Sequence, residues 1–176
     1  PGDQLFAALK QALGCLPFIA EDLGYITPEV VALRERWALP GMRVVQFAFG
    51  SEAADDPHKP HNYARNCIVY TGTHDNDTVL GWFAHLGATE QARVRRYLPS
   101  DGAAVNWDMI RAAWASVAAM AIVPVQDVLG LGTTARMNLP GTRRGNWCWR
   151  LQARQLCAPV SERLRDLTLT YGRQRP

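Results

Sequence analysis

The segment NCIVYTGTHDNDTVLGWF, residues 66–83, holds the pattern on which the fold prediction rests. It begins with an apolar run rich in β-branched and aromatic residues, which predicts a buried strand. It ends with the apolar run VLGWF, which is typical of the start of a helix. Between the two runs lie three side chains that could take part in chemistry: His74, Asp75 and Asp77. The segment therefore predicts a strand, a polar loop and a helix in succession.

Three more apolar runs have the same character and are predicted to be strands. They are CLPFIA at 15–20, MRVVQFAF at 42–49 and AMAIVPV at 119–125. Helical patterns are predicted over residues 4–13, 28–37, 78–86, 89–97, 107–118 and 160–171. Strands that are apolar throughout and separated by helices are typical of a parallel sheet covered by helices. The fold class is therefore α/β, with about four parallel strands.

Composition and charge exclude several classes of protein. Hydrophobic residues make up 48% of the 176 residues and charged residues 20%, the balance of a globular domain. No run approaches the roughly 18 apolar residues that cross a bilayer, and no signal peptide is visible, so we expect a cytoplasmic protein without a membrane partner. The net charge is +3 and the arginines are scattered, so no nucleic-acid partner is expected. The densest basic cluster, RVRRYL at 93–98, is interpreted as the solvated face of a helix.

Polar residues follow three of the four predicted strands. They are Glu21 and Asp22 after the first, His74 to Asp77 after the third, and Gln126 and Asp127 after the fourth. In parallel α/β folds the carboxyl ends of the strands form the edge at which ligands bind. We therefore expect a functional site there. Loop polarity remains an alternative explanation, and Asp77 is interpreted as the N-cap of the helix that begins near Thr78.

Four blocks of the sequence together carry a resemblance to a known family. The blocks are FIAEDLGYITPEV, LPGMRVVQFAF, HNYARNCIVYTGTHDNDTVLGWF and VPVQDVLGLGTTARMNLPGTRRGNWCWR. They resemble the amylomaltases, the 4-α-glucanotransferases or disproportionating enzymes of glycoside hydrolase family 77, almost end to end and in the same order. The resemblance implies a (β/α)₈ barrel and retaining transfer of α-1,4-glucan segments between maltooligosaccharides.

The resemblance also implies roles for particular residues. Glu21 of the AEDLG block corresponds to the general acid/base, and Asp75 of the THDN block to the carboxylate that stabilises the transition state. His74, Asn138 and Trp147 are expected to bind substrate. No cofactor is implied and no metal is expected, because the histidines lack ligand spacing such as HExxH.

The residue types suit this chemistry, although alternatives remain for each. Breaking a glycosidic bond requires a carboxyl that keeps its proton near neutral pH, and Glu21 follows an apolar run where we expect a desolvated setting. Asp22 is its rival, because successive residues of a strand point to opposite faces. Trp147 and Trp149 could stack on sugar rings or serve only in packing.

The family's nucleophile is not found in this sequence. It lies on a strand before the one that carries the acid/base, in a block with an Arg two residues ahead of the Asp. The only carboxylate before Glu21 is Asp3, which is in no such block. A complete (β/α)₈ barrel needs roughly 250 residues. We therefore expect residues 1–176 to be a single partial domain, the C-terminal half of a TIM barrel, inactive alone and prone to self-association.

Two other functions remain open. An α-amylase-clan hydrolase would share the barrel and the three carboxylates, and would release products to water instead of to an acceptor sugar. A non-catalytic glucan-binding module could use His74, Asp75 and the Trp147 region as a sugar platform.

Overall fold

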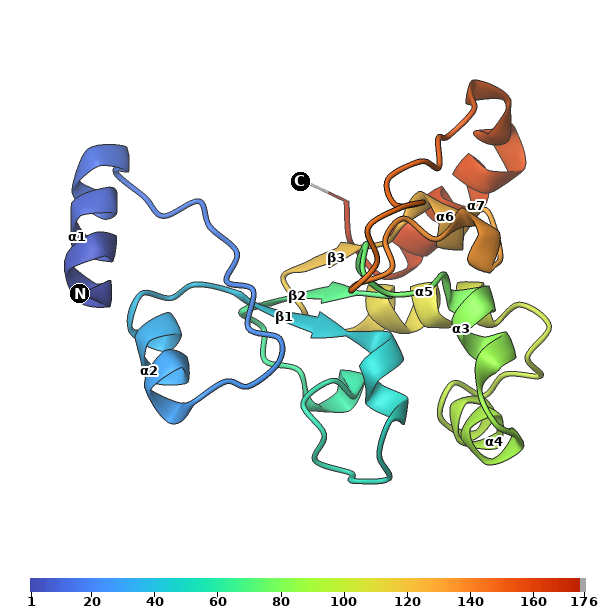
Figure 1. The fold of residues 1–176 in the computed structure, drawn as a ribbon, viewed down its shortest axis with the longest axis horizontal. Coiled ribbons are helices and arrows are strands. Elements are labelled where there is room, and N and C mark those ends of the chain that lie inside the picture. Colours follow the sequence, from blue (N-terminus) through green and yellow to red (C-terminus); the bar gives the residue numbers. More distant parts are fainter. Residues whose placement is uncertain (175–176) are drawn as a thin grey trace.

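A three-stranded parallel sheet organises the structure, a computed structural model that describes residues 1–174 (Figure 1). The strands are β1 (Gly41–Val44), β2 (Cys67–Tyr70) and β3 (Met120–Ile122), and they lie in the order β1-β2-β3. In the register, Val44 is opposite Tyr70, and Tyr70 is opposite Ile122. The prediction of an α/β fold with parallel strands is confirmed.

The predicted helices are present, with ends shifted by at most three residues. They are α1 (Gly2–Leu13), α2 (Pro28–Arg36), α3 (Val79–His85), α4 (Ala88–Tyr97), α5 (Val105–Ala115) and α7 (Ala158–Thr170). A further short helix, α6 (Val125–Val128), follows β3 after two residues and was not predicted.

The prediction of a strand at residues 15–20 was wrong. This run is irregular, and its one backbone bond toward β1 joins the Ala20 amide to the Pro40 carbonyl at 2.9 Å. Pro17 has no amide hydrogen for a ladder, and Phe18 and Ile19 remain exposed. An apolar pattern indicates that residues tend to be buried. A strand also needs a ladder of backbone hydrogen bonds to its neighbour, and this run forms a single bond of that kind.

The two strands that flank β2 are shorter than predicted. Residues Val45–Phe49 form a 3-10 helix instead of continuing β1. The Val44 amide donates to Nδ1 of His58 at 3.1 Å, and the Gln46 amide donates to the Thr71 carbonyl at 3.3 Å, so one backbone bond to the chain after β2 continues beyond the end of β1. After β3, Pro124 has no amide hydrogen to donate, and α6 begins at Val125.

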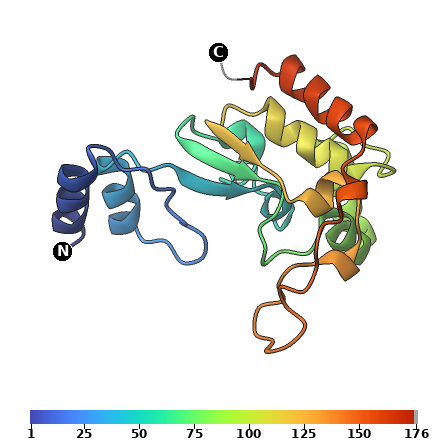
Figure 2. The ribbon, with the colours of Figure 1, turned by 90° about the horizontal axis from the view of Figure 1, so that it is seen from above.

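The two faces of the sheet have different environments. One face packs against α5, where Cys67 and Val69 join Met109 and Ala113 in the main buried cluster. Figure 2 shows α5 between the sheet and α7. On the other face Met120 and Ile122 are exposed, because no helix of the described chain covers them.

Helices α1 and α2 form a small unit that stands apart from the sheet (Figure 1). Asp3 accepts a hydrogen bond from the Trp37 indole at 2.8 Å, and the Phe6 and Trp37 rings lie 5.9 Å apart. Neither helix contains a buried residue. This unit therefore has little core of its own within the described chain.

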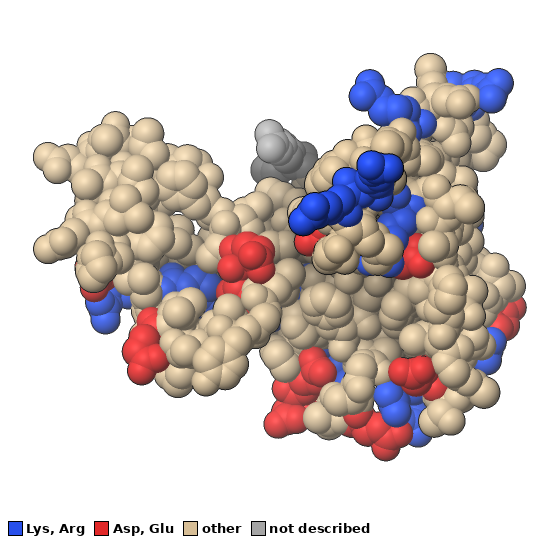
Figure 3. Space-filling view, viewed as in Figure 1, with Lys and Arg blue, Asp and Glu red and all other residues tan. Residues whose placement is uncertain are grey.

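Basic side chains lie in separate groups on the face shown in Figure 3, one of them over the loops that follow α6. They do not form one continuous stripe across this face. This separation agrees with the scattered positions of the arginines in the sequence.

Candidate active site

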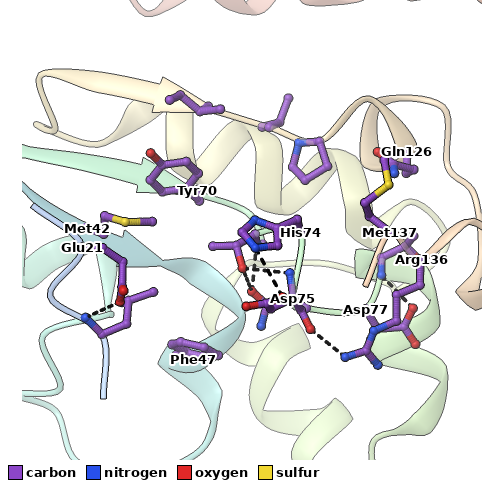
Figure 4. Close-up of a pocket in the computed structure, with 18 of the residues that line it drawn as sticks. Glu21, Met42, Phe47, Tyr70, His74, Asp75, Asp77, Gln126, Arg136 and Met137 are labelled. Carbon is purple, nitrogen blue, oxygen red and sulfur yellow. Dashed lines mark hydrogen bonds and ion pairs between the residues drawn. The ribbon is translucent and has the colours of Figure 1, made fainter. Parts of the chain in front are cut away.

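A cavity of about 980 Å³ opens at the carboxyl edge of the sheet. Each strand contributes residues that follow its end: Phe47 after β1, His74 and Asp75 after β2, and Gln126 after β3 (Figure 4). Glu21 reaches the same cavity from the irregular segment before α2. The fold thus brings Glu21, residues 74–77 and Gln126 together in one site, whereas Asp22 and Asp127 do not line the cavity.

The structure separates Glu21 from its rival Asp22. Asp22 is held by protein groups on both carboxylate oxygens: Oδ1 accepts from the Met42 amide at 2.6 Å, and Oδ2 pairs with the Arg34 guanidinium. The side chain of Asp22 is 7% exposed, and it does not line the cavity. Glu21 lines the cavity, and among residues 1–174 only its Oε1 has a partner, accepting from the Leu23 amide at 3.0 Å.

Glu21 is exposed, so the expected desolvated setting is not provided by the described residues. The irregular segment 15–20 that precedes it leaves Phe18 and Ile19 exposed as well. Apolar residues next to a carboxyl in the sequence desolvate it only if other parts of the structure pack around both.

Asp75 is oriented by the segment that contains Asn138. The Asn138 side-chain amide donates to Asp75 Oδ1 at 2.5 Å, and the Arg136 guanidinium donates to the Asp75 carbonyl at 2.6 Å. His74 Nε2 lies 3.3 Å from the same Oδ1. Asn138 itself does not line the cavity, whereas His74 and Asp75 do.

Trp147 covers His74 from the loop that follows Asn138. Their ring centroids are 5.1 Å apart, and the Trp147 amide donates to the Met137 carbonyl at 2.7 Å. Trp147 has a φ of 60°, in the left-handed region that costs a side-chain-bearing residue roughly 1–2 kcal/mol. It is also 60% exposed. The backbone is therefore held in an unfavourable conformation that presents an indole ring beside the cavity.

Thr78, not Asp77, is the N-cap of α3. The Thr78 hydroxyl accepts from the Gly81 amide at 3.1 Å. Both carboxylate oxygens of Asp77 are used elsewhere: Oδ1 accepts from the Thr78 amide and Oδ2 from the Thr133 hydroxyl, each at 2.8 Å. The Thr78 side chain reaches the amide of the third helical residue, as a cap residue does. Asp77 instead joins its loop to the segment after α6 through Thr133.

The sequence of this chain also matches a known family. The sequence model of the family described as 4-alpha-glucanotransferase, glycoside hydrolase family 77, matches residues 1–156. The chain belongs to this family.

Individual 4-alpha-glucanotransferases are similar to almost the whole chain. The enzyme of Synechocystis sp. is 51% identical over 99% of this chain, and the chloroplastic/amyloplastic enzyme of Arabidopsis thaliana is 49% identical over 98%. The solved structure of an amylomaltase from Streptococcus agalactiae in complex with acarbose matches 99% of this chain with a TM-score of 0.94 and 36% identity. The chain covers 35%, 31% and 36% of these three proteins, so it spans about a third of their length.

Several residues that line the cavity were not predicted as site residues. They are Met42, Phe47, Tyr70, Arg136 and Met137, all labelled in Figure 4. Arg136 and Met137 directly precede Asn138 in the RMN block, and this proximity was an available signal. Phe47 lies within an apolar run whose pattern predicted a continuous strand, and only the 3-10 turn exposes its ring to the cavity.

The other histidines lie in local contacts outside the cavity lining. His58 accepts the Val44 amide, and His61 Nδ1 lies 2.8 Å from the Tyr97 hydroxyl. In residues 1–174 no group of three His, Cys, Asp or Glu side chains could hold a metal ion. Over the same range, no helix is long and apolar enough to span a bilayer.

Proposed function

We propose that this chain forms the acid/base half of a 4-α-glucanotransferase active site, within the C-terminal half of a (β/α)₈ barrel. One observation carries the proposal. Glu21 and Asp75 line one cavity, and within the described residues each has hydrogen bonds or ion pairs on one carboxylate oxygen only. Asp22, Asp77 and Asp127 have protein partners on both oxygens. The two carboxylates free to meet a ligand are thus the two that the family resemblance selects.

The proposed reaction is a retaining double displacement. In the first step a nucleophilic carboxylate outside this chain bonds to the anomeric carbon, the glycosidic bond breaks, and protonated Glu21 gives its proton to the leaving oxygen. In the second step Glu21 takes the proton of an acceptor 4-hydroxyl, whose oxygen bonds to the anomeric carbon and releases the nucleophile. Asp75 stabilises the positive charge that develops on the sugar in both steps.

The substrate class follows from the same assignment. An α-1,4-glucan or maltooligosaccharide occupies the cavity, with its hydroxyls on His74 and a sugar face against the exposed Trp147 ring. Asn138 acts on substrate through Asp75, because its amide nitrogen already donates to that carboxylate. No membrane or nucleic-acid partner belongs to this function, and a cytoplasmic location remains a prediction.

The test is a hybrid enzyme in which this chain replaces the matching third of the Synechocystis relative. On maltotriose the hybrid is expected to form longer maltooligosaccharides as well as shorter products, and the 176-residue chain alone is expected to form none. Glu21→Gln should lower kcat by about 10²–10⁴-fold, the usual contribution of a general acid/base. Glu35→Gln, an exposed change on α2, is the matched control and should leave kcat unchanged.

Each alternative predicts a different outcome. Glucose and maltose without longer products would indicate a hydrolase. An inactive hybrid together with maltoheptaose binding by the chain alone would indicate a glucan-binding module. Full activity of the Glu21→Gln hybrid would refute the assignment of the acid/base.

A further inference from the structure

Asp127 is a buried carboxylate that lies next to the cavity but does not line it. It belongs to α6, is 1% exposed, and burial raises its pKa above the ordinary value of an aspartate. Oδ2 accepts from the Thr71 hydroxyl at 2.6 Å and Oδ1 from the Val79 amide at 2.7 Å. Burying a carboxylate costs free energy unless protein groups satisfy its hydrogen bonds, and these two bonds meet that requirement. A hydrophobic side chain would fill the same space without this cost, so the carboxylate needs an explanation beyond packing.

The two bonds hold both ends of the site loop, which we define as residues 71–79. Thr71 directly follows β2 and is fully buried, and Val79 is the first residue of α3. His74 and Asp75 lie midway between these two anchor points. A single side chain therefore sets the distance between the end of the strand and the start of the helix, and with it the path of the loop.

Asp127 is itself fixed by the core and coupled to the second segment of the site. The buried Asn106 of α5 donates to the Asp127 carbonyl at 2.7 Å. The neighbouring Gln126 donates to the Ala135 carbonyl at 3.3 Å, next to Arg136. Consecutive residues of α6 thus hold the two segments that meet at Asp75, one through the site loop and the other through Arg136 and Asn138.

We propose that Asp127 is a positioning residue for the transfer reaction: it sets the placement of Asp75 and His74 through the two ends of the site loop. The inference rests on the function proposed above. A carboxylate that stabilises charge in a transition state must already be in place when the charge develops. A displacement of the catalytic group by about 1 Å lowers the reaction rate by up to about 10²-fold, even when the loop that carries the group is still folded.

The variants are made in the hybrid enzyme, and kcat is expressed per folded molecule. Asp127→Ala removes both bonds and should lower kcat about 100-fold, with a change of less than about threefold in KM for maltotriose. Asp127→Asn should recover kcat to within about tenfold of the parent, because its carbonyl can accept the Val79 amide while its amide donates to the Thr71 hydroxyl. Thr71→Val removes one bond, and combined with Asp127→Ala it should lower kcat no further.

The matched control is Asp108→Asn on α5. This carboxylate also accepts from a hydroxyl, that of Ser100, but does not line the cavity or contact the site loop. Its kcat should stay within about twofold of the parent.

The outcomes separate the two proposals. An inactive parent hybrid refutes the proposed function itself. With an active parent, kcat within twofold for Asp127→Ala, or equal losses of kcat in Asp127→Ala and Asp108→Asn, would overturn the positioning role. Should Asp127→Ala fail to fold, Thr71→Val decides alone: a tenfold loss of kcat at unchanged KM supports the role, and an unchanged kcat refutes it.

Discussion

At the scale of single residues, the structure assigns different tasks to carboxylates that look alike in sequence. Asp22 joins the segment before α2 to the start of β1, through Arg34 of α2 and the Met42 amide. Glu21, one position earlier, keeps one oxygen free in the cavity. Because both carboxylate oxygens of Asp22 are bonded to neighbouring elements, the adjoining backbone of Glu21 is restrained as well.

Asp22→Asn should therefore destabilise the chain by about 2 kcal/mol, since it removes the buried carboxylate that pairs with the partly buried Arg34 and leaves Arg34 only the exposed Glu35. The side chains of Asp22 and Arg34 are 7% and 15% exposed. Glu35→Gln is the matched control: Glu35 also lies near Arg34, at 3.5 Å, but its side chain is 67% exposed. That change should cost less than about 0.5 kcal/mol.

Urea denaturation at one fixed protein concentration measures both changes. Equal midpoints for Asp22→Asn and the parent would show that the Asp22 contacts contribute nothing to stability.

At the scale of elements, the site is formed by loops that follow the strands and contact one another. The loop from Arg136 to Trp147 lies against the site loop through the Asn138–Asp75 hydrogen bond and the Trp147–His74 ring contact. A positive φ at a tryptophan is maintained only where surrounding contacts determine it. This conformation supports a role for the ring in binding and not only in packing.

The comparison of Trp147→Gly with Trp147→Ala separates the ring from the backbone. Both changes remove the indole, so both should raise KM for maltotriose in the hybrid enzyme by about tenfold, the loss of one aromatic contact of about 1.4 kcal/mol. Glycine accepts a φ of 60° without strain and alanine does not, so the alanine variant should be less stable by about 1 kcal/mol.

Steady-state kinetics and thermal unfolding measure the two effects independently. An unchanged KM in both variants would mean that Trp147 only packs on His74.

At the scale of the whole molecule, apolar surface remains open along one side of the sheet. Met120 and Ile122 are exposed on β3, and Phe18 and Ile19 are exposed beside β1. In the described chain the outer edges of β1 and β3 pair with no further strand. Unpaired edges and open apolar faces favour association with another chain.

The chain alone should consequently form dimers or larger species in sedimentation velocity at micromolar concentration. Met120→Lys places a charge on the open face and should shift the distribution toward the monomer. Leu169→Lys is the control, because Leu169 is similarly exposed but lies on α7, away from the open face. A monomeric parent chain, or equal shifts in the two variants, would contradict association through the sheet.

The order of helices and strands was largely determined by the sequence, because periodicity and turn residues act over a few neighbouring positions. The helices from α1 to α5 and α7 were predicted in this way, as was the run from β2 into its polar loop. The family motifs also selected Glu21, His74 and Asp75, which the fold brings to one cavity.

Only the tertiary structure decided which partners each side chain meets. It decided that 15–20 stays irregular beside β1, that Thr78 caps α3, and that Phe47 leaves the strand pattern to line the cavity. It also brought Asp127 to the two ends of the site loop, across a sequence separation of about fifty residues. Hydrogen-bond partners and burial depend on segments distant in the chain, and a local pattern carries no information about their positions.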